Sequence, residues 1–187
     1  MYMRKMAVGP VARGRINLGK SIGENVAAIA EAYGRRPGDI TAIVLDRPRH
    51  HDLIEELRSS GTRIKLIGDG TVTASISAAI RGTNDHLAIG IGGTRQAVLT
   101  AAALRCLGGG MQAQLWPTTR SQIDAAREIG IEDVGHVFTE EDLAPGDVIV
   151  LDPDAPPAEP SGSNGFAIAP SRTASGKAML LINPHTS

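Results

Sequence analysis

Three short segments of the chain carry residue types that could bind or process a phosphate group. The segments are Arg47-Pro-Arg-His-His51, Asp69-Gly-Thr71 and Gly92-Gly93. Arginine binds phosphate through two parallel hydrogen bonds, and a glycine turn that opens a helix offers free backbone N–H groups to an anion. If the fold brings these segments together, they form a phosphate site. A surface pairing of arginine with aspartate, without any ligand, is the alternative explanation.

Each segment follows a stretch typical of a buried strand and precedes one typical of a helix. Apolar runs predict strands at residues 40–45, 63–67 and 87–91. Three strand–helix units in succession predict a three-layer α/β domain with a mostly parallel sheet. Ligands of such sheets bind where the strands end, so the three segments should share one edge, here called the rim. Gly92-Gly93 is expected to be a turn there, with Thr94 as the N-cap of the next helix.

The composition limits the classes of function. The chain has 187 residues, 42% of them hydrophobic but only 3% aromatic, with a net charge of −1. A basic surface rich in aromatic residues is therefore excluded, and we expect no nucleic-acid partner. The single cysteine, Cys106, excludes an intrachain disulfide and a cysteine-based zinc cluster, and it fits a reducing cytoplasm. No apolar run approaches the roughly 20 residues of a membrane span, so we expect a cytoplasmic protein without a membrane partner.

The chain divides into three parts. Residues 1–151 should form the α/β domain, residues 152–162 a proline-rich linker, and residues 163–187 an appended tail with a short β-hairpin. The opening strand begins at Tyr2 without an arm before it. We therefore expect this strand to lack its upstream partner and, because uncovered strands seek partners, the chain to form a homo-oligomer.

Residues 1–150 resemble the C-terminal half of class II fructose-1,6-bisphosphatase. The resemblance rests on Asp46-Arg-Pro-Arg-His50, Ile67-Gly-Asp-Gly70, Gly90-Ile-Gly-Gly93 and the run from Ala103 to Leu115. It implies a small phosphorylated molecule as the ligand. It also implies a set of substrate-binding residues, namely Tyr2, Arg47, Arg49, Gly70 and Gly93.

The departures from the family concern its metal ligands. Thr71 and Gln96 stand where the family has acids, and its N-terminal half is absent. A metal-assisted phosphatase needs carboxylates to hold its divalent ion, so we do not expect ordinary fructose-1,6-bisphosphatase activity. The remaining catalytic candidates are Asp69 and His50, and those for a zinc, manganese or magnesium ion are His50, His51 and Asp69. Two histidines that only contact phosphate and solvent are the alternative.

Residues 162–187 are similar to a different family, the start of the β-chain of penicillin-acylase-type N-terminal nucleophile hydrolases. Ser163 matches the nucleophile of that family, and Asn183-Pro-His185 also fits its pattern. Only a fragment of that domain is present, so the tail is expected to be a grafted segment without acylase activity. The whole chain is interpreted as a fusion of two gene fragments.

Two functions follow from these observations. The first is a metal-assisted phosphoester hydrolase, acting on a phosphate mono- or diester at a remodelled sugar-phosphate site. The second is a non-catalytic remnant that binds phosphate or only associates with itself. His86 lies at the start of the strand that ends in the glycine pair, so it should be far from the rim.

Overall fold

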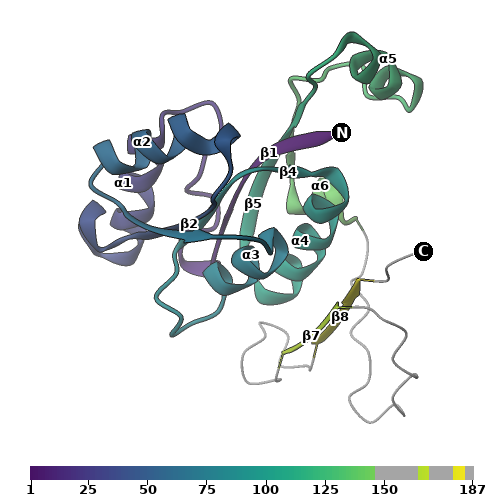
Figure 1. Cartoon of the computed structure of the whole chain (residues 1–187). Coiled ribbons are helices and arrows are strands. Elements are labelled where there is room, and N and C mark those ends of the chain that lie inside the picture. The colour runs from purple at the N-terminus through teal and green to yellow at the C-terminus, as the bar shows by residue number, and fades with distance from the viewer. Residues whose placement is uncertain (146–163, 169–178, 184–187) are drawn as a thin grey trace.

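The computed structural model describes residues 1–145, 164–168 and 179–183. Residues 1–145 form one sheet with helices on both faces, so the predicted three-layer α/β architecture is confirmed (Figure 1). No helix among these residues is long and apolar enough to cross a membrane.

The sheet within residues 1–145 has six strands. They are β1 (Tyr2–Val8), β2 (Thr41–Leu45), β3 (Arg63–Ile67), β4 (Leu87–Gly93), β5 (Gly110–Trp116) and β6 (Val137–Thr139). Their spatial order is β3-β2-β4-β1-β5-β6. Strands β3, β2, β4 and β5 share one direction, whereas β1 and β6 run against their neighbours. The sheet is therefore mixed, and its parallel part holds the three strands that end at the rim.

Helices cover both faces of this sheet. The helices of the domain are α1 (Ile22–Tyr33), α2 (His51–Ser59), α3 (Thr71–Ala79), α4 (Thr94–Leu107), α5 (Arg120–Glu128) and α6 (Glu140–Leu143). Single turns lie at η1 (Pro10–Ala12), η2 (Pro37–Asp39) and η3 (Pro48–His50). Ser21 and Glu24 form a capping box that starts α1, because each satisfies a backbone N–H group of the other.

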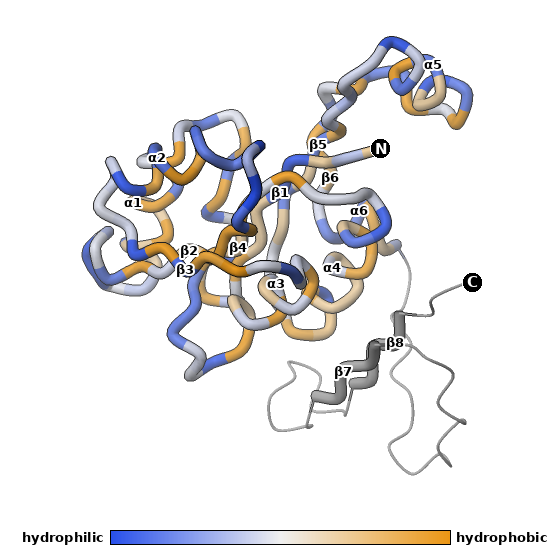
Figure 2. Tube along the Cα trace, in the orientation of Figure 1, coloured by the Kyte–Doolittle hydropathy of each residue, from blue (hydrophilic) through white to orange (hydrophobic). Residues whose placement is uncertain are grey.

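Side chains that alternate along β1 separate two apolar cores. Met3 and Ala7 pack with α3 and α4, whereas Met6 and Val8 pack with α1 and α2. This alternation follows from the two-residue period of a strand. Apolar segments accordingly line the inside of the domain in Figure 2. Lys5 belongs to the same row as Met3 and Ala7, so a lysine lies in an apolar layer.

Two expectations about the rim and the first strand are wrong. Gly92 and Gly93 are not a turn but the end of β4, where they pair with Met3 and Tyr2. The N-cap of α4 is therefore Gly93 rather than Thr94. Strand β1 pairs on both sides, with β4 and β5, so it is not an uncovered edge. The edges of the sheet are β3 and β6.

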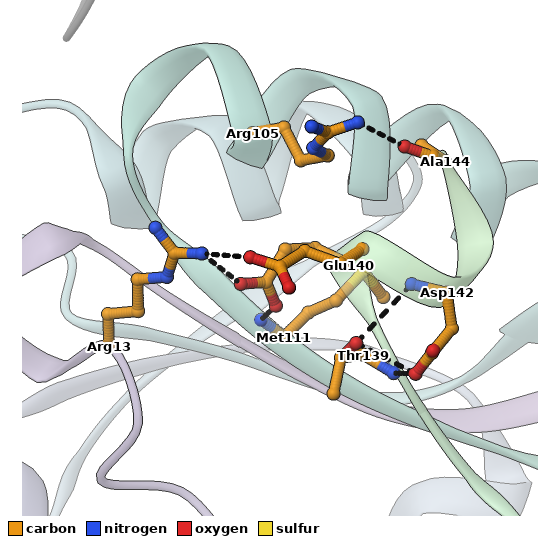
Figure 3. Close-up of polar contacts among 8 residues, drawn as sticks. Arg13, Arg105, Met111, Thr139, Glu140, Asp142 and Ala144 are labelled. Atoms are coloured by element: carbon orange, nitrogen blue, oxygen red, sulfur yellow. Dashed lines mark hydrogen bonds and ion pairs between the residues drawn. The ribbon is translucent and has the colours of Figure 1, made fainter. Parts of the chain in front are cut away.

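A buried carboxylate attaches α6 to the other end of the sheet (Figure 3). Glu140 is buried, and one of its oxygens accepts the backbone N–H of Met111 at 2.8 Å. Its second oxygen lies 3.1 Å from the guanidinium of Arg13, which also pairs with Glu141. Thr139 caps α6 by a capping box with Asp142. These contacts explain the position of α6 and involve no residue of the rim.

The tail is described only in part. Strands β7 (Asn164–Ile168) and β8 (Met179–Asn183) pair antiparallel, which confirms the two strands of the predicted hairpin. The predicted linker at residues 152–162 and the turn of the hairpin lie outside the described residues.

Candidate functional site

The rim lies where β2, β3 and β4 end, beside the N-terminus in Figure 1. Arg49 connects two of its segments, because its Nε donates to the carbonyl oxygen of Ile91 at 3.1 Å. The Arg49 guanidinium also lies 5.4 Å from the centre of the Tyr2 ring, a cation–π contact. Tyr2 pairs with Gly93 across β1 and β4. The structure thus brings together Tyr2, Arg49 and Gly93.

Arg47 joins the ends of β2 and β3. It donates to the carbonyl oxygens of Asp46 and Gly68, at 2.8 and 2.7 Å. These bonds hold its guanidinium next to the segment that begins with Asp69. In the part of the chain that the structure describes, neither Arg47 nor Arg49 forms an ion pair with a carboxylate. Both positive charges are therefore available to an anionic ligand.

The start of α3 supplies a third element of the rim. Gly70 has φ +94°, a conformation that favours glycine, and it is the N-cap of α3 without any side-chain cap. Asp69 is exposed, and its Oδ1 accepts the N–H of Gly70 at 2.7 Å. Asp69 therefore lies at the rim as predicted, as an exposed carboxylate one residue away from the carbonyl that Arg47 binds.

His50 has a different role from the predicted one. Its side chain is buried, and its Nδ1 donates to the carbonyl oxygen of Leu45 at 2.8 Å. Its Nε2 accepts the N–H of Ile91 at 2.8 Å. Since both ring nitrogens are used by the backbone, His50 has no lone pair left for a metal ion or a proton from a substrate. It ties β2 to β4 below the rim, which is a structural function.

The glycine opposite His50 explains how the ring fits. An ideal Cβ at Gly90 would lie 3.1 Å from two atoms of the imidazole, closer than most real contacts. His51, the other predicted metal ligand, is an exposed residue at the start of α2. The two adjacent histidines therefore face different surroundings and do not form one site.

The described residues do not fit a divalent metal ion by themselves. No group of three or more histidine, cysteine, aspartate or glutamate side chains within residues 1–145 could hold one. Thr71 and Gln96 are neutral, and the Gln96 amide lies over Gly93.

A buried cation lies next to the end of β4. The Nζ of Lys5 has no hydrogen-bond partner among the described residues. It lies 3.5 Å from an ideal Cβ at Gly92. Burial lowers the pKa of Lys5 from 10.5 to about 8.

Lys5 was missed by the motif-based interpretation. The signal was present in the sequence, since Met3, Lys5 and Ala7 share one face of a strand and Lys5 is the charged residue between two apolar ones. A charged residue in such a row either has a partner or lies close to a ligand.

The rim of the α/β sheet thus carries two arginines without a carboxylate partner among the described residues, an aromatic ring and a helix start without a side-chain cap. A model of the family "Bacterial fructose-1,6-bisphosphatase, glpX-encoded" matches residues 1–152. The chain therefore belongs to this family. The resemblance noted for residues 1–150 is confirmed.

Curated relatives carry the name D-fructose 1,6-bisphosphatase class 2/sedoheptulose 1,7-bisphosphatase. The protein from Crocosphaera subtropica is 38% identical over 162 residues, which cover 80% of this chain and 47% of the relative. The one from Trichodesmium erythraeum is 38% identical over 163 residues, covering 81% and 47%. The chain thus spans about half the length of the curated relatives it matches.

The match to the family model ends at residue 152, so the resemblance of residues 162–187 to acylases stays a prediction. Ser163 and His185 lie outside the described residues.

Proposed function

We propose that the rim binds the phosphate group of a small phosphorylated molecule, with a sugar phosphate as the ligand class. The observation that carries this proposal is the pair Arg47 and Arg49, held in place by backbone carbonyls and free of carboxylate partners among the described residues. Tyr2, Gly70 and Gly93 complete the proposed binding surface. The ring of Tyr2 orients Arg49, and Gly70 allows a ligand to approach the backbone closely.

Calorimetry with fructose 1,6-bisphosphate tests this proposal, with unphosphorylated fructose as the ligand control. Arg49→Ala should weaken binding by roughly 1–3 kcal/mol, the range for a hydrogen bond to a charged group. Arg58→Ala is the matched control, because Arg58 is an exposed arginine on α2 that pairs with Glu55. Equal affinity of the wild type and Arg49→Ala would refute phosphate binding at the rim.

Metal-assisted hydrolysis of a phosphate mono- or diester is the second candidate. Two observations favour it, namely the exposed carboxylate of Asp69 beside Arg47 and membership of a phosphatase family. Asp69 offers one oxygen ligand to a zinc, manganese or magnesium ion, and the other ligands would have to come from outside the described residues. We assign no catalytic step to a metal on residues 1–145 alone. We expect little or no turnover of fructose 1,6-bisphosphate by this chain.

Phosphate release with added zinc, manganese or magnesium separates binding from hydrolysis. If hydrolysis occurs, a chelator should abolish it, and Asp69→Ala should remove more of it than Ser163→Ala or the control Asp52→Ala. Asp52 is an exposed acid in the first turn of α2. Activity that survives both the chelator and Asp69→Ala would exclude this candidate, and efficient turnover of fructose 1,6-bisphosphate would contradict the expectation of an altered site.

Self-association stays a prediction, and it now depends on strand β3 instead of β1. One of the two sheet edges is β3, and Leu66 on β3 is 44% exposed. Edge strands with exposed apolar side chains can pair with a second copy, although Arg63 and Lys65 on the same strand oppose it. Light scattering of the purified chain decides the question, since a monomer mass would exclude the oligomer.

A further inference from the structure

A second pocket lies at the end of the sheet opposite to the rim. It has a volume of about 330 Å³ and lies between the loop after α3, the end of α1 and the start of β4. Its polar lining includes Arg35, Arg81, Asp85 and His86, and its apolar lining includes Val11 and Ile80. A volume of this size is at the lower end of the range for small-molecule sites.

His86 is buried at the base of this pocket, and its tautomer is fixed by the backbone. The N–H of Thr41 donates to Nδ1 of His86 at 3.1 Å. Because Nδ1 accepts a hydrogen bond, it carries no proton, and the proton of the neutral ring lies on Nε2. Burial and the nearby Arg35 lower the pKa of His86, which favours this neutral form. Nε2 is therefore a hydrogen-bond donor.

The group in front of Nε2 is another donor. Nη1 of Arg35 lies 3.0 Å from Nε2 of His86, and a guanidinium has no lone pair to accept a hydrogen bond. Arg35 has one acceptor, the amide oxygen of Asn84 at 3.3 Å, and no ion pair with a carboxylate among the described residues. Two donors thus converge without an acceptor between them.

The acid that lines this pocket, Asp85, is already engaged. Asp85 is buried, and its Oδ2 binds the ammonium group of Lys65 at 2.9 Å and the hydroxyl of Ser77. Arg81 lines the pocket as an additional cation. The charges that remain to act on a ligand in this pocket are therefore positive.

We propose that this pocket is a second anion site, in which one oxygen of a phosphate or carboxylate group accepts from both Nε2 of His86 and the guanidinium of Arg35. An acceptor at this place removes the conflict between the two donors. Arg81 adds charge, and the apolar side chains of Val11 and Ile80 contact the body of the ligand. The ligand class is a small organic anion with one apolar side. The site is separate from the rim because it lies at the opposite end of β4.

Nuclear magnetic resonance of the histidine ring nitrogens tests the proposal with inorganic phosphate and acetate as separate probes. Without ligand, the His86 ring should carry its proton on Nε2, and His86→Gln assigns its signals. Phosphate, acetate or both should shift these signals with saturation, and the probe that saturates at the lower concentration identifies the anion. Arg35→Gln should raise the concentration for half-saturation at least tenfold.

Two variants keep this test specific. Arg36→Gln is the matched control, because Arg36 is the neighbouring exposed arginine and pairs with Asp39. It should leave the saturation curve unchanged. Arg49→Gln should remove binding at the rim and leave the His86 shifts intact. A proton on Nδ1, shifts that never saturate with either probe, or shifts that respond to Arg49→Gln rather than Arg35→Gln would overturn the proposal.

Discussion

The two ends of β4 each hold a buried histidine, and the two histidines differ in what their second nitrogen faces. His50, 1% exposed, donates to a carbonyl oxygen and accepts from an N–H group. His86, 3% exposed, accepts from an N–H group, but its other nitrogen faces a guanidinium. The first ring is satisfied by the protein, whereas the second needs an acceptor. Burial and the number of neighbours therefore do not identify a ligand-binding histidine; the direction of its hydrogen bonds does.

The same comparison applies to the cations at the two ends of the sheet. Lys65, near His86, has a carboxylate partner in Asp85. Lys5, near the rim, is buried without any partner. Each end thus combines one satisfied group with one unsatisfied group, and the unsatisfied group lies next to a proposed anion site in both cases.

Removal of His50 is expected to have the largest effect. His50→Ala leaves the carbonyl of Leu45 and the N–H of Ile91 without partners and opens a cavity between β2 and β4. The free energy of unfolding should fall by about 3–5 kcal/mol, measured by urea denaturation. His50→Gln should lose less, because its amide offers both a donor and an acceptor.

The neighbouring histidine is the control for this prediction. His51 is exposed, so His51→Ala should change the free energy of unfolding by less than about 0.5 kcal/mol. Equal small losses for both variants would contradict the structural function of His50. A loss that appears only in the presence of a divalent metal would restore His50 as a metal ligand.

Lys5→Met should have the next largest effect, and in the opposite direction. At pH 7 the buried ammonium of Lys5 is charged in both the folded and the unfolded state, although burial disfavours it in the folded one. The shift of its pKa from 10.5 to about 8 corresponds to roughly 3 kcal/mol. A methionine of similar shape should therefore raise the free energy of unfolding by up to about 3 kcal/mol at pH 7.

The pH dependence of this gain distinguishes it from improved packing. Between pH 8 and 10.5 the unfolded chain binds more protons at Lys5 than the folded chain, so the stability contributed by this group rises with pH. The advantage of Lys5→Met should therefore shrink over this interval. Lys20→Met, at an exposed lysine, should show neither effect. A constant advantage across the interval would mean that Lys5 is not penalised by its charge.

The local elements could be predicted from the sequence because each has a short-range cause. The strand at residues 63–67 is confirmed to the residue, and α1 and α6 begin at capping boxes formed by residues three positions apart. The order of strands could not be predicted in the same way, because β1 lies between β4 and β5 through pairings far apart in the sequence. The interpretation of β1 as an edge failed for this reason.

In the candidate site, too, the features with a local cause could be predicted and those that depend on distant strands could not. Arg47, Arg49 and Asp69 were placed on one rim because strand ends follow from local patterns. The role of His50 could not be predicted, since it depends on which backbone groups the ring meets across two strands. Gly92-Gly93 looked like a turn because glycine is typical of turns, but pairing with β1 extends the strand through both residues. Hydrogen-bond direction is a property of the folded structure.

The smallest expected effect on stability is at Arg35, next to His86. Arg35→Gln replaces a donor with an amide whose oxygen can accept the Nε2 proton of His86, so the free energy of unfolding without ligand should stay equal or rise by up to about 1 kcal/mol. Arg35→Met removes the conflict without offering an acceptor and should gain less. Loss of stability in Arg35→Gln, with Arg36→Gln unchanged, would mean that Arg35 stabilises His86 rather than opposing it. In that case the two histidines at the ends of β4 would be alike, and the pocket around His86 would have no need of an anion.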